Sequence, residues 1–146
     1  MAKRDRIDDI IDIVLPMPDP LPENADEDER DGHWAWSDET DRKRRELEED
    51  LRSTEEHSEP YVDPLLEQIH RARRDMLEAE ERMRLLVAYG REFVSPQPYP
   101  LKSLAAATGM SISGTRSAYT VEEVATVARR IGRQPRVRNG EAGSAP

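Results

Sequence analysis

Cysteine is absent from this chain of 146 residues, and long apolar runs are absent too. Without cysteine, the chain has no disulfides, no thiolate metal ligands and no cysteine nucleophile. The early apolar run IIDIVL is interrupted by Asp12 and is too short for a secretion signal or a membrane span. We therefore expect a cytoplasmic protein that does not enter a membrane.

Aromatic residues are scarce, at 5% of the chain, and the hydrophobic share of 36% only equals the charged share of 36%. A chain of this length and composition supports at most one small folded domain. Basic residues are scarce in its first part: residues 1–63 carry 9 Lys and Arg against 22 Asp and Glu, whereas residues 64–146 carry 13 against 9. This asymmetry predicts an acidic arm attached to a basic working module.

The acidic arm, residues 1–62, is predicted to be mostly disordered, with short amphipathic helices. Four apolar residues recur on one helical face before a proline ends the pattern: Ile7, Ile10, Ile11 and Val14. About three turns are marginal for an isolated helix in water. This face therefore either docks on its own chain or binds a protein partner.

Both tryptophans, Trp34 and Trp36, follow a proline-rich acidic stretch that we interpret as a linker. Ser37 is positioned to cap a charged helix after them. The tryptophan pair is either an anchor onto the downstream module or an exposed motif that binds a protein partner.

A long helix is predicted from Asp63 to about Tyr89, because Asp63 can cap it and Pro64 suits its first position. Apolar residues along it alternate four and three apart, as in a coiled-coil seam: Leu65, Ile69, Ala72, Met76, Ala79, Met83 and Leu86. In a parallel homodimer, Asp75 and Glu80 would face each other and repel. We therefore favour packing of the seam against the following helices over a parallel homodimer, and an antiparallel pairing stays open.

The stretch YPLKSLAAATGMSISGTRSAYT, residues 99–120, has the pattern of a helix-turn-helix. Its first helix begins at Leu101 and ends at Gly109, which can adopt the backbone that a sharp turn needs. Ser111 can cap a second helix that is expected to run to Tyr119. Three small residues allow this second helix to approach the first closely: Gly114, Thr115 and Ala118.

This stretch resembles the helix-turn-helix units of bacterial transcription regulators. Ala105, Gly109, Met110 and the pair Ser113 and Gly114 resemble the λ-repressor type. YPLKSLAAATGMS, together with the arginine that follows it, is similar to the opening helices of MerR-type regulators and to the last region of sigma factors. The resemblance covers about a sixth of the chain and implies an all-α fold that binds DNA. It departs from these families at Thr115 and Ala118, where they usually place larger aliphatic residues.

A third helix is predicted after Thr120, which forms a capping box with Glu123. Its inward face is expected to hold Val121, Val124, Val127, Ala128 and Ile131. Residues 95–146 carry 7 basic and 3 acidic side chains, a balance that attracts phosphates. The tail, residues 134–146, is predicted to be basic and disordered, with Arg136 and Arg138 in it.

The predicted DNA-binding residues belong to two classes. Serine and arginine can hydrogen-bond base edges, and isoleucine can touch a thymine methyl. These base-reading candidates are Ser111, Ile112, Ser113, Arg116 and Ser117. The candidates for holding phosphates are Lys102, Arg129, Arg130 and Arg133.

No catalytic set stands out, because His33, His57 and His70 have no paired ligand spacing, and no phosphate-binding glycine loop or dinucleotide fingerprint occurs. We therefore expect no enzyme, no metal site and no cofactor. The sequence predicts an all-α transcription regulator that binds double-stranded DNA through a helix-turn-helix domain at residues 63–133. A monomer of this size would bind weakly, so a specific site would need a homodimer or recruitment by another protein through the N-terminal arm. The alternative is an adaptor, similar to an antitoxin, whose N-terminal arm binds a protein partner.

Overall fold

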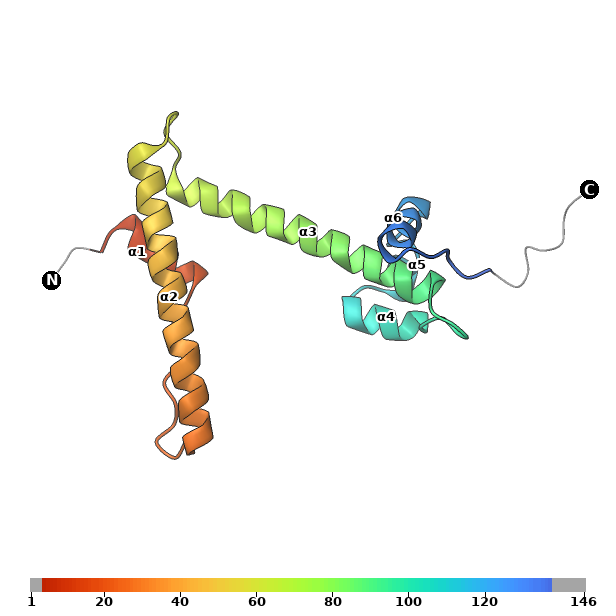
Figure 1. Ribbon diagram of the computed structural model, residues 1–146, viewed down its shortest axis with the longest axis horizontal. Coiled ribbons are helices and arrows are strands. Elements are labelled where there is room, and N and C mark those ends of the chain that lie inside the picture. Colours follow the sequence, from red (N-terminus) through yellow and green to blue (C-terminus); the bar gives the residue numbers. More distant parts are fainter. Residues whose placement is uncertain (1–3, 138–146) are drawn as a thin grey trace, which may run out of the picture. The chain divides into compact units, whose positions relative to one another are not determined.

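The computed structural model describes residues 4–137, in which there are six α-helices and no strand (Figure 1). The prediction of an all-α protein is confirmed. The chain divides into two compact units, Met1–Arg73 and Arg74–Pro146. Arg138 and the rest of the predicted tail after it lie outside the described residues.

Helix α1, Arg6–Val14, begins with a capping box in which Asp5 and Asp8 each accept a hydrogen bond from the other's backbone N–H. Three of the four residues on its predicted apolar face are buried against the next helix, in a core formed by Ile7, Ile10, Ile11 and Leu51, whereas Val14 is 44% exposed. The predicted short helix is confirmed, and it docks on its own chain. The prediction of a largely disordered arm is wrong, because this burial supplies the tertiary packing that a short helix needs.

Helix α2, Glu27–His57, begins well before the predicted cap at Ser37, which lies inside the helix. Its start is a second capping box, in which Asp26 accepts from the N–H of Glu29 and Glu29 accepts from the N–H of Asp26. The acidic block was interpreted as linker from its composition. In the structure, its acids cap the helix and occupy its first turn, where they interact favourably with the helix dipole.

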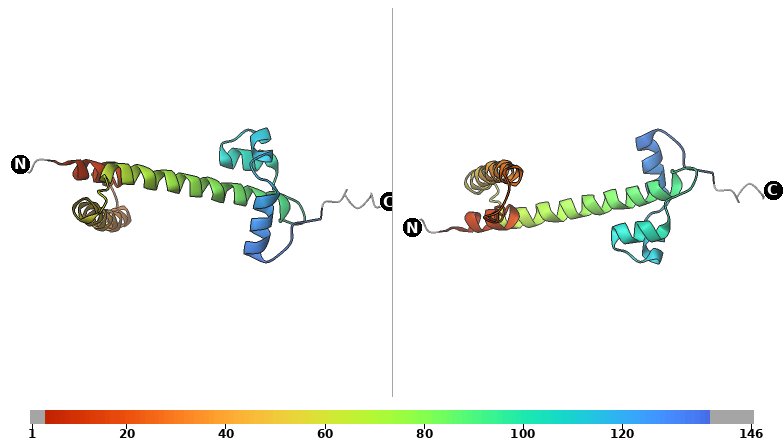
Figure 2. Two further views of the ribbon diagram at one scale, coloured as in Figure 1. Left: turned by 90° about the horizontal axis from the view of Figure 1, so that it is seen from above. Right: turned by 90° about the horizontal axis from the view of Figure 1, so that it is seen from below.

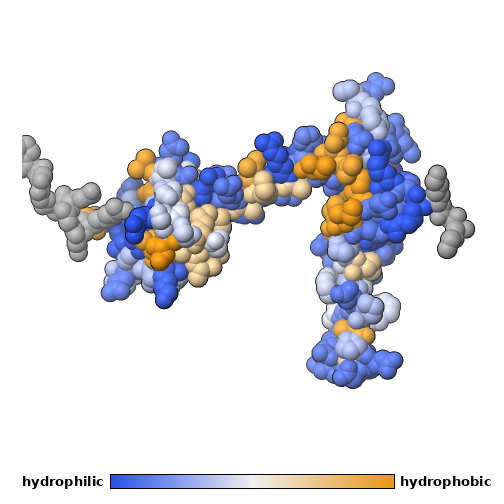
Figure 3. All heavy atoms as spheres, turned by 180° about the vertical axis from the view of Figure 1, so that it is seen from behind, coloured by the Kyte–Doolittle hydropathy of each residue, from blue (hydrophilic) through white to orange (hydrophobic). Residues whose placement is uncertain are grey.

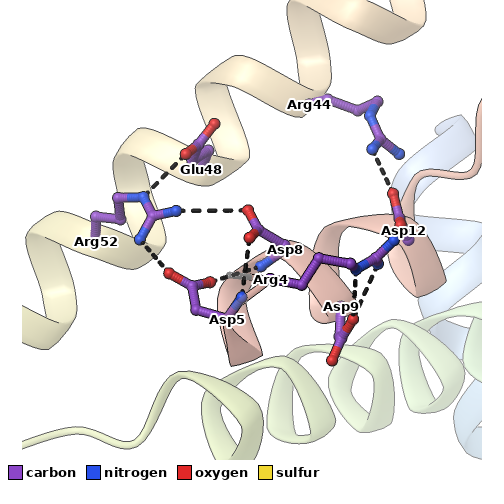
Figure 4. Close-up of polar contacts among 8 residues, drawn as sticks. All are labelled: Arg4, Asp5, Asp8, Asp9, Asp12, Arg44, Glu48 and Arg52. Atoms are coloured by element: carbon purple, nitrogen blue, oxygen red, sulfur yellow. Dashed lines mark hydrogen bonds and ion pairs between the residues drawn. The ribbon is translucent and has the colours of Figure 1, made fainter. Parts of the chain in front are cut away.

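An ionic cluster holds α1 against α2 (Figure 4). Arg52 donates to the Asp5 carboxylate over 2.9 Å, and Arg44 donates to the Asp12 carboxylate. The N–H of Asp8 and the Arg52 guanidinium lower the pKa of Asp5. Arg44 and then Arg4 lower the pKa of Asp12 by hydrogen bonding to its charged form.

Helix α3, Pro64–Glu92, confirms the predicted long helix. Asp63 caps it by accepting hydrogen bonds from the N–H groups of Leu65 and Leu66 over 2.9 and 3.1 Å. Arg6 connects this start to the rest of the first unit, because it pairs with Asp63 at 3.0 Å and with Glu55 at 2.9 Å. The N-terminal unit thus holds the beginning of α3 in place.

The C-terminal unit is built around the last turns of α3. Its core contains Leu85, Ala88, Phe93 and Val127, with Tyr89 stacked on Phe93 at a centroid distance of 6.3 Å. Helices α4, Leu101–Thr108, and α5, Ile112–Arg116, lie on one side of this end of α3. Helix α6, Val121–Ile131, lies on the other side (Figure 2).

Two predicted packing faces differ from the structure. On α6, Val127 is buried and Val124 and Ala128 pack beside it, but Val121 is 83% exposed and Ile131 is also exposed. Val121 is the first residue of the helix and lies beyond the edge of the core. On α3, the favoured packing of the seam against the following helices is wrong, because most of the seam is exposed and the neighbouring face, with Leu85 and Ala88, forms the core.

Candidate nucleic-acid interface

Helices α4 and α5 are joined by a turn that the sequence specifies closely. Gly109 ends α4 with φ of 71°, in the left-handed region that favours glycine. The Thr108 hydroxyl donates to the carbonyl of Ala105 and accepts from the N–H of Met110, over 3.2 and 3.3 Å. Ser111 then caps α5 by accepting from the N–H of Gly114 over 2.9 Å. The predicted turn and both of its caps are confirmed.

The inner side of this pair of helices is closed by Thr115, which is fully buried, and by Ala105. The close approach at Gly114 leaves little space, since an added Cβ would lie 3.1 Å from the Ser111 hydroxyl. The two helices therefore form one fixed hairpin, whose outer side chains are held in a defined arrangement.

Helix α5 is shorter than predicted, because it ends at Arg116 and not at Tyr119. The Ser117 side chain folds back and donates to the carbonyl of Ser113 over 3.0 Å, which satisfies the end of the helix. The Tyr119 hydroxyl donates to Glu92 over 2.8 Å, so Tyr119 belongs to the core side of the unit. Sequence periodicity gave no sign of this hydrogen bond.

The structure brings together six of the predicted DNA-binding residues. They lie on α4, on α5 and at the ends of α5, and all of them are exposed: Lys102, Ser111, Ile112, Ser113, Arg116 and Ser117. The hydroxyl groups of Ser111 and Ser117 already take part in the caps of α5. Ser113 and Arg116 present their side chains at the surface without a hydrogen bond or an ion pair to another described side chain.

The other three predicted residues are in a different place. Arg129 and Arg130 are exposed in the last turn of α6, across α3 from the α4–α5 pair (Figure 2). The Arg133 guanidinium carbon lies 5.9 Å from the centre of the Tyr89 ring, in a cation–π contact. These arginines therefore do not form one continuous surface with α5.

Sequence reasoning missed two arginines close to Arg116. An open cleft of about 850 Å³ is lined by Arg116, Arg91 and Arg136, together with Glu92 and Tyr119. Arg91 donates to the carbonyl of Tyr99 over 2.9 Å, and Arg136 donates to the carbonyl of Arg91 over 3.2 Å. The long helix was expected to end at about Tyr89, so Arg91 was not considered. Arg136 was assigned to a disordered tail.

No protein-family model, curated protein or solved structure matches this chain. Within residues 4–137 there is no group of three or more His, Asp or Glu side chains arranged to hold a metal ion. The same part of the chain contains no helix long and apolar enough to cross a membrane.

Proposed function

We propose that this protein binds double-stranded DNA through the α4–α5 hairpin, which acts as a helix-turn-helix. The observation that carries the proposal is the exposed set Ile112, Ser113 and Arg116 on a hairpin fixed by Gly109 and Thr115. Ser113 and Arg116 can hydrogen-bond base edges or phosphates, and Ile112 can contact a thymine methyl.

Charge around the hairpin supports the same proposal. Residues 95–137 contain six basic and two acidic side chains, in contrast with the acidic first unit. One of these acids, Glu123, is engaged in the cap of α6, where hydrogen bonds from the Thr120 hydroxyl and backbone lower its pKa. Lys102 lies on α4, and Arg91 and Arg136 lie in the cleft beside Arg116. These cations would attract the phosphate backbone.

The experiment is a fluorescence-anisotropy titration of a labelled mixed-sequence duplex with the full chain, repeated over a salt series. We expect affinity to fall steeply as salt rises, because cations released from the duplex drive binding. Arg116→Ala should weaken binding roughly tenfold or more. Arg45→Ala is the matched control, since Arg45 is an exposed helical arginine of the acidic unit that pairs with Asp41.

The α6 arginines are tested separately, because they lie across α3 from the hairpin. Arg129→Ala combined with Arg130→Ala should change affinity less than Arg116→Ala alone if the hairpin faces the duplex. An equal loss from the Arg45→Ala and Arg116→Ala variants would indicate nonspecific attraction only. No change in anisotropy at low salt would refute DNA binding.

A second candidate function, binding of a protein partner through the N-terminal unit, is supported by exposed aromatic surface. Trp34 and Trp36 on α2 are 75% and 60% exposed, although tryptophan is usually largely buried. In this candidate, the tryptophans and not the α1 face bind the partner, because Ile7, Ile10 and Ile11 are buried on Leu51. Cross-linking in cell extract from a photoreactive residue at position 34, with position 45 as control, tests it: a partner captured only from position 34 supports it.

A further inference from the structure

The middle of α3 carries an exposed apolar seam. Every residue from 72 to 82 is exposed, which is roughly three helical turns. The seam residues Ile69, Met76 and Leu86 are 55%, 61% and 67% exposed. Figure 3 shows hydrophobic groups among the hydrophilic surface along this helix. A helix segment of this length is marginal in water without tertiary packing, so the exposed seam calls for a partner.

Charge disfavours one arrangement of two such helices. In a parallel pair, the residues flanking the seam meet with an offset of five positions, which places Asp75 opposite Glu80 on both sides of the pair. Both carboxylates are exposed on α3, and both would repel their counterparts. The contacts that flank the seam would therefore destabilise a parallel homodimer.

Reversing one helix changes the size matching in the seam. With Met76 opposite Ala79 of a second copy, Ala72 meets Met83 and Ile69 meets Leu86. The two methionines then each face an alanine, which lets the helices approach closely while the large side chains fill the space between them. In a parallel pair each alanine would face the same alanine of the second copy, so the antiparallel register fills the seam better.

The same reversal changes the sign of the flanking contacts. Asp75 now faces Arg82 of the second copy, and Arg73 faces Glu80. Because the pair has a two-fold axis, each contact occurs twice, giving four contacts between opposite charges. Glu80 lies 3.7 Å from Arg84 of its own helix, a weak surface contact that leaves it accessible.

The C-terminal end of the seam offers a further point of contact. An apolar cavity of about 380 Å³ lies beside Leu86, lined also by Tyr89, Val127 and Ile131. In the antiparallel register, Ile69 of the second copy reaches the helix surface at Leu86. It can therefore cover this cavity, which α6 leaves open in a single chain.

We propose that this protein forms an antiparallel homodimer through α3, in the register that pairs Met76 with Ala79 of the second copy. The interface is the seam Ile69, Ala72, Met76, Ala79, Met83 and Leu86, flanked by the four charge contacts. The proposal does not depend on DNA binding, and its tests contain no nucleic acid.

The first test is sedimentation equilibrium of the full chain over a concentration series. The expected mass is twice the 16.7 kDa of one chain. Arg82→Glu should raise the dissociation constant of the dimer roughly tenfold, because the new glutamate faces Asp75 of the second copy and the two-fold symmetry repeats this repulsion. Adding Asp75→Arg to it should restore dimerisation. Arg74→Glu, on the outward face of α3, is the matched control and should leave the constant unchanged.

The second test determines orientation and uses the absence of cysteine. Chains labelled with ¹⁵N and carrying only Ile69→Cys are mixed with unlabelled chains carrying only Leu86→Cys under mild oxidation, and the disulfide-linked dimers are weighed by mass spectrometry, where the label separates mixed from identical pairs. An antiparallel pair forms the mixed disulfide, because these two positions face each other. Disulfides only between identical chains would overturn the antiparallel register, and a monomer mass at every concentration would overturn the dimer.

Discussion

Thr115 donates its hydroxyl hydrogen to the backbone carbonyl of Ser111 over 2.9 Å, and it does so from a fully buried position. The same carbonyl also accepts the backbone N–H of Thr115, over 2.9 Å. The hydroxyl is therefore a second donor to an acceptor that is already satisfied. This relationship decides which substitutions the α4–α5 hairpin tolerates.

We expect Thr115→Val to lower the local free energy of unfolding by about 1 kcal/mol, because it removes one hydrogen bond but leaves the Ser111 carbonyl paired with the backbone N–H of Thr115. Thr115→Ala should cost about 1 to 2 kcal/mol, since it opens a cavity between the two helices. Amide hydrogen exchange of α4 and α5, measured by NMR, checks both values. A larger loss for valine than for alanine would contradict this account.

Two glycine substitutions should have opposite effects. Gly109→Ala should destabilise the hairpin by about 1 kcal/mol, because φ of 71° is unfavourable for a residue with a Cβ. Gly32→Ala should stabilise α2 by about 1 kcal/mol, because Gly32 is inside the helix and nothing lies within 4 Å of its added Cβ. Hydrogen exchange of the two helices reports both. If both substitutions stabilised their helices, or both destabilised them, the explanation from backbone conformation would be wrong.

Leu51→Ala should detach α1, since Leu51 is buried among Ile7, Ile10 and Ile11. The expected loss is about 2 to 5 kcal/mol from the N-terminal unit. Isoleucine methyl resonances in NMR spectra should move to unfolded positions for α1 but not for Ile112 in α5. Leu77→Ala, at an exposed position of α3, is the control and should leave all of them unchanged.

Acid should release α1 in the same way. The folded pKa values of Asp5 and Asp12 are lowered, so their contribution is complete above the unfolded value of about 4 and is lost as pH falls below it. The methyl resonances of Ile10 and Ile11 should therefore shift only below about pH 4. Asp12→Asn should weaken this pH dependence, and an unchanged titration in that variant would exclude the Asp12 contact as its source.

Helix ends in this protein could be predicted where a short local pattern determines them. Asp63 with Pro64, Thr120 with Glu123, and Gly109 with Ser111 act as their sequence indicates. Each of these depends on residues within four positions of one another. Local hydrogen bonding and backbone sterics decide them, and distant contacts are not needed.

The order of the N-terminal unit could not be predicted from local patterns. Composition indicated a disordered arm, but Arg44 and Arg52 on α2 pair with aspartates of α1 that are about 30 to 50 positions away in the sequence. The acidic residues that suggested a hydrated chain instead form ion pairs with these arginines and cap the helices. The candidate site could be predicted only in part for the same reason, because sequence periodicity does not reveal that Arg91 and Arg136 lie beside Arg116.

The backbone N–H of Arg136 donates to the carbonyl of Glu92, the last residue of α3. This hydrogen bond joins two segments of the C-terminal unit that α4, α5 and α6 separate in the sequence. In the N-terminal unit, Arg6 pairs with Asp63 and Arg71 pairs with Asp50, both much earlier in the chain. Domains generally fold in order as the ribosome releases them. During synthesis, the first unit can therefore form these contacts once Arg71 has emerged. The second unit can form the hydrogen bond of Arg136 only after Arg136 has left the exit tunnel. Until then, α3 is accessible to factors that bind nascent chains.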